Sequence, residues 1–124
     1  MSKYSLLIVD ADAYYAGIFA SRFEAAGWKV RVVETVEDAE LLLERKPVDA
    51  VMIDVEPFET AIPFIHALHR ESESVVTVLT NLGDRKTIEE SKEAGVDGYF
   101  LKGHFFPSEA IQKLKRLIEE RVTN

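Results

Sequence analysis

The chain has 124 residues, 47% of them hydrophobic and 30% charged, with no cysteine and a formal net charge of -7. A chain of this length buries roughly two thirds of the surface that it exposes when unfolded, so one hydrophobic core can hold a single domain over residues 1–124. The lack of cysteine excludes thiol catalysis and thiolate ligation of metals. The acidic balance, without a basic stripe, argues against direct binding to nucleic acid or to an anionic membrane.

The N-terminal segment does not resemble a targeting signal. The apolar run that leads to Asp10 is too short for a secretory signal and far too short to span a bilayer. We therefore expect a soluble, cytoplasmic domain.

Five short segments rich in apolar and β-branched residues predict strands, and segments with helical spacing of apolar residues separate them. Most of the five are continuously apolar, which is typical of a parallel sheet covered on both faces. The predicted strands are residues 6–9, 30–33, 50–53, 75–79 and 99–101.

The first two predicted helices follow the first two strands. The first ends at Gly27, which suits a left-handed C-terminal cap, and Thr35 opens the second. Pro47 prevents the second helix from continuing. The inward positions are Tyr15, Ile18, Phe19, Phe23 and Ala26 in the first helix, and Val36, Ala39, Leu42 and Leu43 in the second.

The remaining three predicted helices differ in how apolar they are. The third has Pro63 in its first turn, and the fourth starts after Asp84 and ends at Gly95. The fourth offers little apolar surface, so we expect it to be the least firmly packed and the most mobile. The fifth takes Ser108 as its N-cap. The inward positions are Ile62, Ile65 and Leu68 in the third, Ile88 and Ala94 in the fourth, and Ile111, Leu114, Leu117, Ile118 and Val122 in the fifth.

This alternation predicts an α/β fold, a (βα)5 doubly wound parallel sheet with the flavodoxin-like strand order 2-1-3-4-5. In such a sheet function lies at the carboxyl ends of the strands, where this chain places Asp10, Asp54, Thr80 and Lys102. Each of the four alone has an ordinary structural explanation, such as capping or solvation. Together they match phosphoryl chemistry, in which a carboxylate nucleophile needs a divalent cation, and the phosphoryl oxygens need a hydroxyl and a fixed cation.

The four residues lie in motifs through which the chain resembles the receiver domain of two-component response regulators, the CheY-like family, from about residue 3 to 122. The motifs are LLIVD at 6–10, DAVMID at 49–54, VLTN at 78–81 and GYFLK at 98–102.

The resemblance implies a role for each residue. Asp54 accepts a phosphoryl group from a histidine kinase or a phosphotransfer protein of a phosphorelay, Asp10 and Asp54 help to hold Mg²⁺, and Thr80 and Lys102 bind the phosphoryl oxygens. Tyr99 stands at the aromatic switch position, although an ordinary strand aromatic explains it equally well. The resemblance also implies a phosphoacceptor rather than an enzyme, with autophosphatase activity as the one reaction of its own. A downstream protein would bind the face formed by the fourth and fifth helices and the fifth strand.

The acidic residues expected to hold the metal depart from the family pattern at Ala11, where a second acidic metal ligand is usual. Because Mg²⁺ needs only one or two carboxylates with waters, we expect weak binding rather than none. Glu56 is the candidate substitute ligand, and Asp12 is the other, although Asp12 also fits the N-cap of the first helix.

Two loops depart as well. Pro57 comes one residue earlier than in the family pattern, so the loop after Asp54 is one residue shorter. Gly103 replaces the proline whose cis bond helps to aim the lysine in the family, and a cis bond before glycine costs about 2.5 to 4 kcal/mol. The segment 105–107 adds one residue before the last helix.

Two alternative functions remain open. A degenerate pseudo-receiver, acting as a phosphorylation-independent interaction module, is favoured by Ala11 and Gly103. The run Asp10-Ala11-Asp12 is also similar to the nucleophile pair of haloacid-dehalogenase-type phosphatases, for which Asp10 would be the nucleophile, but the chain has no room for a cap domain.

Histidines and aromatics near the ends of elements carry weaker hypotheses. His66 and His69 have a spacing that permits metal ligation, but no partner completes the site, and His104 is close enough to the site to sense pH. Phe105 and Phe106 belong either to a partner surface or to the core.

Overall fold

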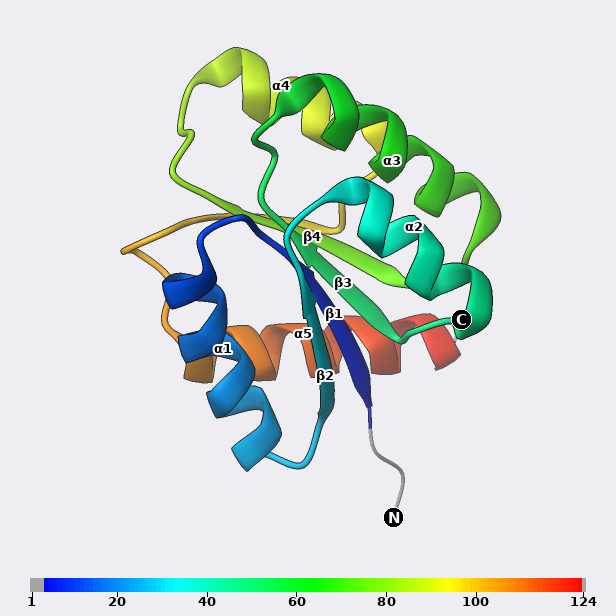
Figure 1. Cartoon of the computed structure of the whole chain (residues 1–124), viewed down its shortest axis with the longest axis vertical. Coiled ribbons are helices and arrows are strands. Elements are labelled where there is room, and N and C mark those ends of the chain that lie inside the picture. The colour runs from blue at the N-terminus through cyan, green and yellow to red at the C-terminus, as the bar shows by residue number, and fades with distance from the viewer. Residues whose placement is uncertain (1–3, 124) are drawn as a thin grey trace.

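The computed structural model describes residues 4–123 as five strands that alternate with five helices (Figure 1). The strands are β1 (Ser5–Val9), β2 (Lys29–Val33), β3 (Ala50–Ile53), β4 (Val75–Thr80) and β5 (Gly98–Leu101). The helices are α1 (Ala13–Ala25), α2 (Val36–Arg45), α3 (Phe58–Glu71), α4 (Arg85–Ala94) and α5 (Pro107–Thr123).

The five strands form one parallel sheet in the order β2-β1-β3-β4-β5, which confirms the predicted topology. Helices α1 and α5 cover one face of the sheet, and α2, α3 and α4 cover the other (Figure 1). The register pairs Val9 of β1 with Ile53 of β3. The residues that follow these two strands therefore emerge side by side at one edge.

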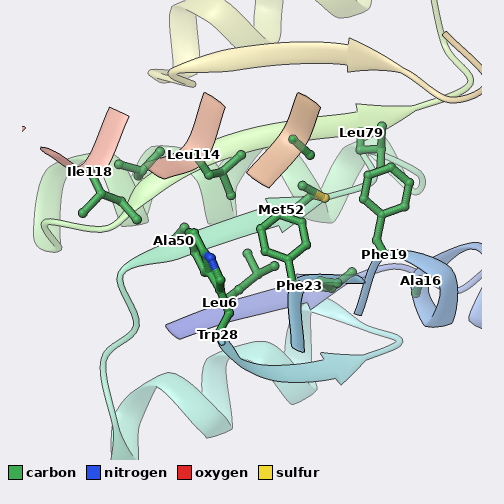
Figure 2. Close-up of a cluster of buried hydrophobic side chains, with 13 residues drawn as sticks. Leu6, Ala16, Phe19, Phe23, Trp28, Ala50, Met52, Leu79, Leu114 and Ile118 are labelled. Atoms are coloured by element: carbon green, nitrogen blue, oxygen red, sulfur yellow. The ribbon is translucent and has the colours of Figure 1, made fainter. Parts of the chain in front are cut away.

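Each face of the sheet has its own hydrophobic core. On the α1 and α5 side, Phe19 and Phe23 pack on strand residues such as Met52, with Leu114 closing the layer (Figure 2). The strands β3 and β4 are buried throughout, and β1 is buried after its first residue, as their continuous apolar runs predict. The edge strand β2 is different, because Val32 is 42% exposed.

The predicted helix caps are largely confirmed. Asp12, Thr35 and Asp84 accept backbone N–H bonds at the starts of α1, α2 and α4. Gly27 and Gly95 adopt the left-handed φ values of 96° and 108° after α1 and α4.

Two helical details were predicted wrongly. Pro63 lies inside α3 rather than in its first turn, because the helix already begins at Phe58. Pro63 is exposed, and because proline has no N–H it leaves the carbonyl of Glu59 without its usual partner in the helix. Ser108 is not the N-cap of α5, because Pro107 opens that helix and Glu109 Oε1 accepts the N–H of Phe106 at 2.9 Å.

Two residues predicted to point inward are less buried than expected. Ile18 is 40% exposed, so the buried stripe of α1 is narrower than predicted. Ile88 is only half-buried, and α4 packs on α3 and β5 mainly through the small residues Thr87, Ser91 and Ala94. The thin apolar face of α4 is thus confirmed, while its mobility stays a prediction. The side chain of Val122 lies outside the described residues.

Candidate functional site

The four residues predicted at the sheet edge lie together in the structure. Asp10 and Asp54 directly follow β1 and β3, Thr80 is the last residue of β4, and Lys102 directly follows β5. Parallel strands end on the same side, which is why residues far apart in the chain converge here.

Lys102 bridges the two aspartates. Its Nζ lies 2.9 Å from Asp10 Oδ2 and 2.9 Å from Asp54 Oδ2, and its side chain is only 4% exposed. Burial opposes the charged ammonium, but the hydrogen bonds to both carboxylates outweigh it and raise the pKa of Lys102. Burial also raises the pKa of Asp10, despite the Lys102 ammonium that favours its charged form.

The carboxylate of Asp54 is fixed by three donors. Thr80 Oγ1 donates to Asp54 Oδ1 at 2.6 Å, and the backbone N–H of Glu56 donates to the same oxygen at 3.2 Å. Lys102 holds the other oxygen. Asp54 is therefore the point on which the hydroxyl and the ammonium converge.

The carboxylate of Asp10 is fixed by its own loop. Its Oδ1 accepts the backbone N–H of Asp12 at 2.9 Å, and Asp12 in turn caps α1 by accepting the N–H of Tyr15. This confirms Asp12 as the N-cap. Ala11 between them is exposed and supplies no side-chain ligand.

A pocket of about 470 Å³ opens beside the two aspartates, between the start of α2 and the start of α3. Glu56 is exposed and lines this pocket together with Asp10 and Asp54. Four further glutamates line it, namely Glu34, Glu37, Glu40 and Glu59. The entrance to the site is therefore acidic, which favours the approach of cations.

The donor set near this pocket fits a weakly held Mg²⁺. Asp10 and Asp54 bring two carboxylates together, and one or two carboxylates with waters are what Mg²⁺ usually takes from a protein. Among residues 4–123 no group of three or more histidine or carboxylate side chains converges. Glu56 lines the same pocket, but no contact of its side chain with either aspartate is present in the described part of the chain.

Tyr99 is connected to the site through one backbone segment. Its hydroxyl donates to the carbonyl of Leu82 at 2.6 Å, and the N–H of Leu82 donates to Thr80 Oγ1 at 3.4 Å. Burial, with lesser contributions from Asp84 and Asp54, raises the pKa of Tyr99 to about 12. The backbone of Leu82 thus connects Thr80 with Tyr99 through two hydrogen bonds.

Tyr15 is a site residue that the sequence did not reveal as one. Its hydroxyl accepts the N–H of Gly103 at 2.9 Å, and Lys102 Nζ lies 5.0 Å from the centre of its ring. The helical pattern correctly placed Tyr15 on the inward face of α1, but that pattern carries no information about contacts across the sheet. Among the described residues the only cis bond is Glu56–Pro57, so the Lys102–Gly103 bond is trans.

The weaker hypotheses have different outcomes. His66 and His69 on α3 have no third ligand within residues 4–123, and His104 is exposed. Phe105 stacks on Phe100 with ring centres 3.8 Å apart and joins the core, whereas Phe106 is 65% exposed.

Comparison with known proteins supports the resemblance. No protein-family model matches the chain. It is 29% identical over 119 residues to the phosphate regulon transcriptional regulatory protein PhoB of Pseudomonas aeruginosa. The match covers 92% of this chain and 51% of that protein, so the chain spans about half the length of this curated relative.

Two solved structures with the same architecture are described as response regulators. A receiver domain protein from Methanospirillum hungatei matches with a TM-score of 0.90 at 20% identity, over 98% of both chains. A response regulator from Thermotoga maritima matches with a TM-score of 0.87 at 24% identity, over 95% of this chain and 99% of that one. The chain has the fold of CheY-like receiver domains, to which it is similar in sequence.

Receiver domains take part in two-component signalling with histidine kinases, typically bind Mg²⁺ and are generally not enzymes in their own right. This chain combines the aspartate, threonine and lysine of such domains with Ala11 and Gly103. None of its described helices is both long and apolar enough to cross a membrane.

Proposed function

We propose that this receiver domain accepts a phosphoryl group on Asp54 from a histidine kinase or a phosphotransfer protein, and that the modification switches a partner-binding face. The observation that carries the proposal is the convergence of donors on Asp54. Thr80 Oγ1 lies 2.6 Å from one carboxylate oxygen and Lys102 Nζ lies 2.9 Å from the other.

The same contacts favour Asp54 over Asp10 as the nucleophile. Lys102 serves both carboxylates, but the Thr80 hydroxyl donates to Asp54. A phosphatase of the haloacid-dehalogenase type would need the reverse arrangement, with Asp10 as nucleophile. Both aspartates border the open pocket through which a phosphoryl donor can approach, so the Thr80 contact is what distinguishes them.

In the transfer, a carboxylate oxygen of Asp54 forms a bond to phosphorus while the bond between phosphorus and the donor histidine nitrogen breaks. The electron pair of that bond leaves with the imidazole, which departs neutral because its other ring nitrogen carries a proton, and Asp54 becomes an acyl phosphate. Lys102 and Thr80 then bind phosphoryl oxygens in place of the carboxylate oxygens that they hold now. Hydrolysis of the acyl phosphate by water would be the autophosphatase reaction of the domain.

Asp10 and Asp54 would hold Mg²⁺, with Glu56 as the candidate third contributor. The ion supplies charge neutralisation between the nucleophile and the phosphoryl oxygens when it is bound. Because Ala11 removes one usual ligand, we expect this binding to be weak.

The switch would run through Thr80 and Leu82 to Tyr99. Phosphorylation leaves close to two negative charges on the phosphoryl group at Asp54 and draws Thr80 and Lys102 inward towards it. The Leu82 backbone, which bonds both Thr80 and Tyr99, transmits that change to the α4, β5 and α5 face. A downstream protein would bind that face.

The test is intact mass after incubation with a small phosphoryl donor, with and without Mg²⁺. We expect one metal-dependent phosphoryl adduct in the wild type and in the Asp38→Asn control, whose side chain is exposed on α2. The adduct should be absent from Asp54→Asn and slower to form in Asp10→Asn. An adduct that persists in Asp54→Asn and disappears in Asp10→Asn would overturn the assignment of the nucleophile.

The second candidate is the phosphorylation-independent interaction module. Exposed Ala11, which offers no metal ligand beside Asp10, is the observation that favours it. No adduct under any condition would support this candidate against the phosphoacceptor.

A further inference from the structure

Tyr15 makes two contacts with the segment that carries the site lysine. Its hydroxyl oxygen accepts the backbone N–H of Gly103 at 2.9 Å, and its ring lies under Lys102 Nζ at 5.0 Å from the ring centre. Tyr15 belongs to α1, and Lys102 and Gly103 follow β5, so these contacts join two elements 88 residues apart in the chain.

We propose that Tyr15 is a positioning residue, which holds the loop after β5 and aims the Lys102 ammonium at the phosphoryl site. The inference rests on the proposed chemistry at Asp54 for its functional consequence. Its structural part concerns only how the ammonium is held.

Gly103 makes the first contact feasible. Its backbone has a φ of 85°, a conformation that favours glycine, and its N–H is free to donate to the phenol. A proline at this position would have no N–H and could not form the bond. In this chain, the loop next to Lys102 is therefore held by a hydrogen bond from Gly103 to Tyr15, after a trans peptide bond.

The ring provides the second contact. An ammonium above an aromatic face gains electrostatic stabilisation, and the gain is larger where water is excluded. Lys102 meets that condition, because its side chain is only 4% exposed. The ring of Tyr15 stacks on Phe19 with centres 5.4 Å apart, and Phe19 is 2% exposed, so a core residue supports it.

A continuous series of polar contacts connects Tyr15 with Asp12, Asp10 and Lys102. The N–H of Tyr15 donates to Asp12, and the N–H of Asp12 donates to Asp10 Oδ1. The other oxygen of Asp10 contacts Lys102. Tyr15 is thus held at its backbone by the loop that orients Asp10, and it holds the lysine with its side chain.

Two substitutions separate the contacts. Tyr15→Phe removes the bond to Gly103 and keeps the ring, so we expect phosphorylation of Asp54 to slow about threefold to tenfold. Tyr15→Leu removes both contacts, and we expect a loss of about thirtyfold. The matched control is Tyr14→Phe, because Tyr14 is the neighbouring tyrosine and is 80% exposed.

A double-mutant cycle with Lys102→Ala distinguishes positioning from a general structural role. If Tyr15 acts through the lysine, Tyr15→Phe in the Lys102→Ala background should change the rate less than twofold. The same loss in both backgrounds would overturn the proposal, and so would equal rates for Tyr15→Phe and Tyr14→Phe.

NMR of the unphosphorylated protein tests the structural part without any phosphoryl transfer. Tyr15→Phe should speed hydrogen exchange at the Gly103 amide about tenfold, and Tyr15→Leu should in addition shift the Lys102 side-chain resonances. Tyr14→Phe should do neither. If the wild type is not phosphorylated, the proposed function is wrong. If the Gly103 and Lys102 signals are unchanged in both Tyr15 variants, the positioning role of Tyr15 is wrong.

Discussion

Lys102 and Asp10 follow strands that are not neighbours in the sheet, yet Lys102 Nζ lies 2.9 Å from Asp10 Oδ2. The lysine reaches across the end of the sheet and also contacts Asp54 at 2.9 Å. One ammonium thus serves two carboxylates in a buried cluster. The cluster keeps an excess negative charge, and this excess has measurable consequences for stability, metal binding and switching.

Asp10→Asn should stabilise the protein at pH 7. Burial raises the pKa of Asp10 above its ordinary value of 3.8, so the folded state disfavours the ionised form. The ionised group therefore lowers the free energy of unfolding at neutral pH, and this penalty disappears as the pH falls below 3.8, where Asp10 is protonated in both states. Thermal melts of wild type and variant between pH 3 and pH 7 should converge at the acid end. A variant less stable at pH 7 would contradict the prediction.

Lys102→Met should destabilise the protein by about 2 to 4 kcal/mol at pH 7, because two buried carboxylates lose their ammonium. The loss should shrink towards pH 4, since protonation then relieves the unpaired charges. Urea unfolding at several pH values measures both effects. The control is Lys115→Met, at an exposed position of α5, which should change stability by less than about 0.5 kcal/mol.

Glu56→Ala should weaken Mg²⁺ binding about threefold to tenfold if this glutamate replaces the ligand that Ala11 lacks. Titration followed by NMR or fluorescence gives the affinity. Glu59→Ala is the matched control, because Glu59 is an exposed glutamate that lines the same pocket from α3. Equal affinities in wild type and Glu56→Ala would show that Glu56 is no ligand.

Phosphorylation of Asp54 should shift the backbone resonances of Tyr99 and of residues 84–95. The expected path is the pair of bonds that Leu82 makes with Thr80 and Tyr99. Tyr99→Phe removes the second bond and should reduce the shifts in α4 at least twofold, with little change near Asp54. Shifts that stay confined to the site in the wild type would refute this coupling.

Two glycines should respond to alanine in opposite directions. Gly95 has a φ of 108°, and a Cβ there would clash with the His69 ring, so Gly95→Ala should cost about 2 kcal/mol or more. Gly17 lies in α1, and a Cβ at this position would have no atom within 4 Å. Gly17→Ala should therefore raise the free energy of unfolding by about 0.5 to 1 kcal/mol. Chemical unfolding of both variants checks the pair, and a stabilised Gly95→Ala would be inconsistent with the left-handed cap.

Local pattern was enough to predict the strands, the strand order and the four residues at the sheet edge. Continuous apolar runs mark buried parallel strands, and Asp10, Asp54 and Lys102 directly follow such runs. Once the strands are parallel, the residues after them converge. Caps such as Asp12 and Asp84 were predictable for the same reason, because a cap acts within three residues of its own position.

Helix starts and contacts across the sheet were decided by the tertiary structure. Glu109 bonds back to Phe106 and moves the start of α5 ahead of Ser108, and α3 begins early enough to enclose Pro63. The position of Tyr15 beside Lys102 depends on how α1 packs on the sheet relative to the loop after β5. Periodicity determines which face of a helix is buried, but only the packed structure determines which atoms its side chains meet.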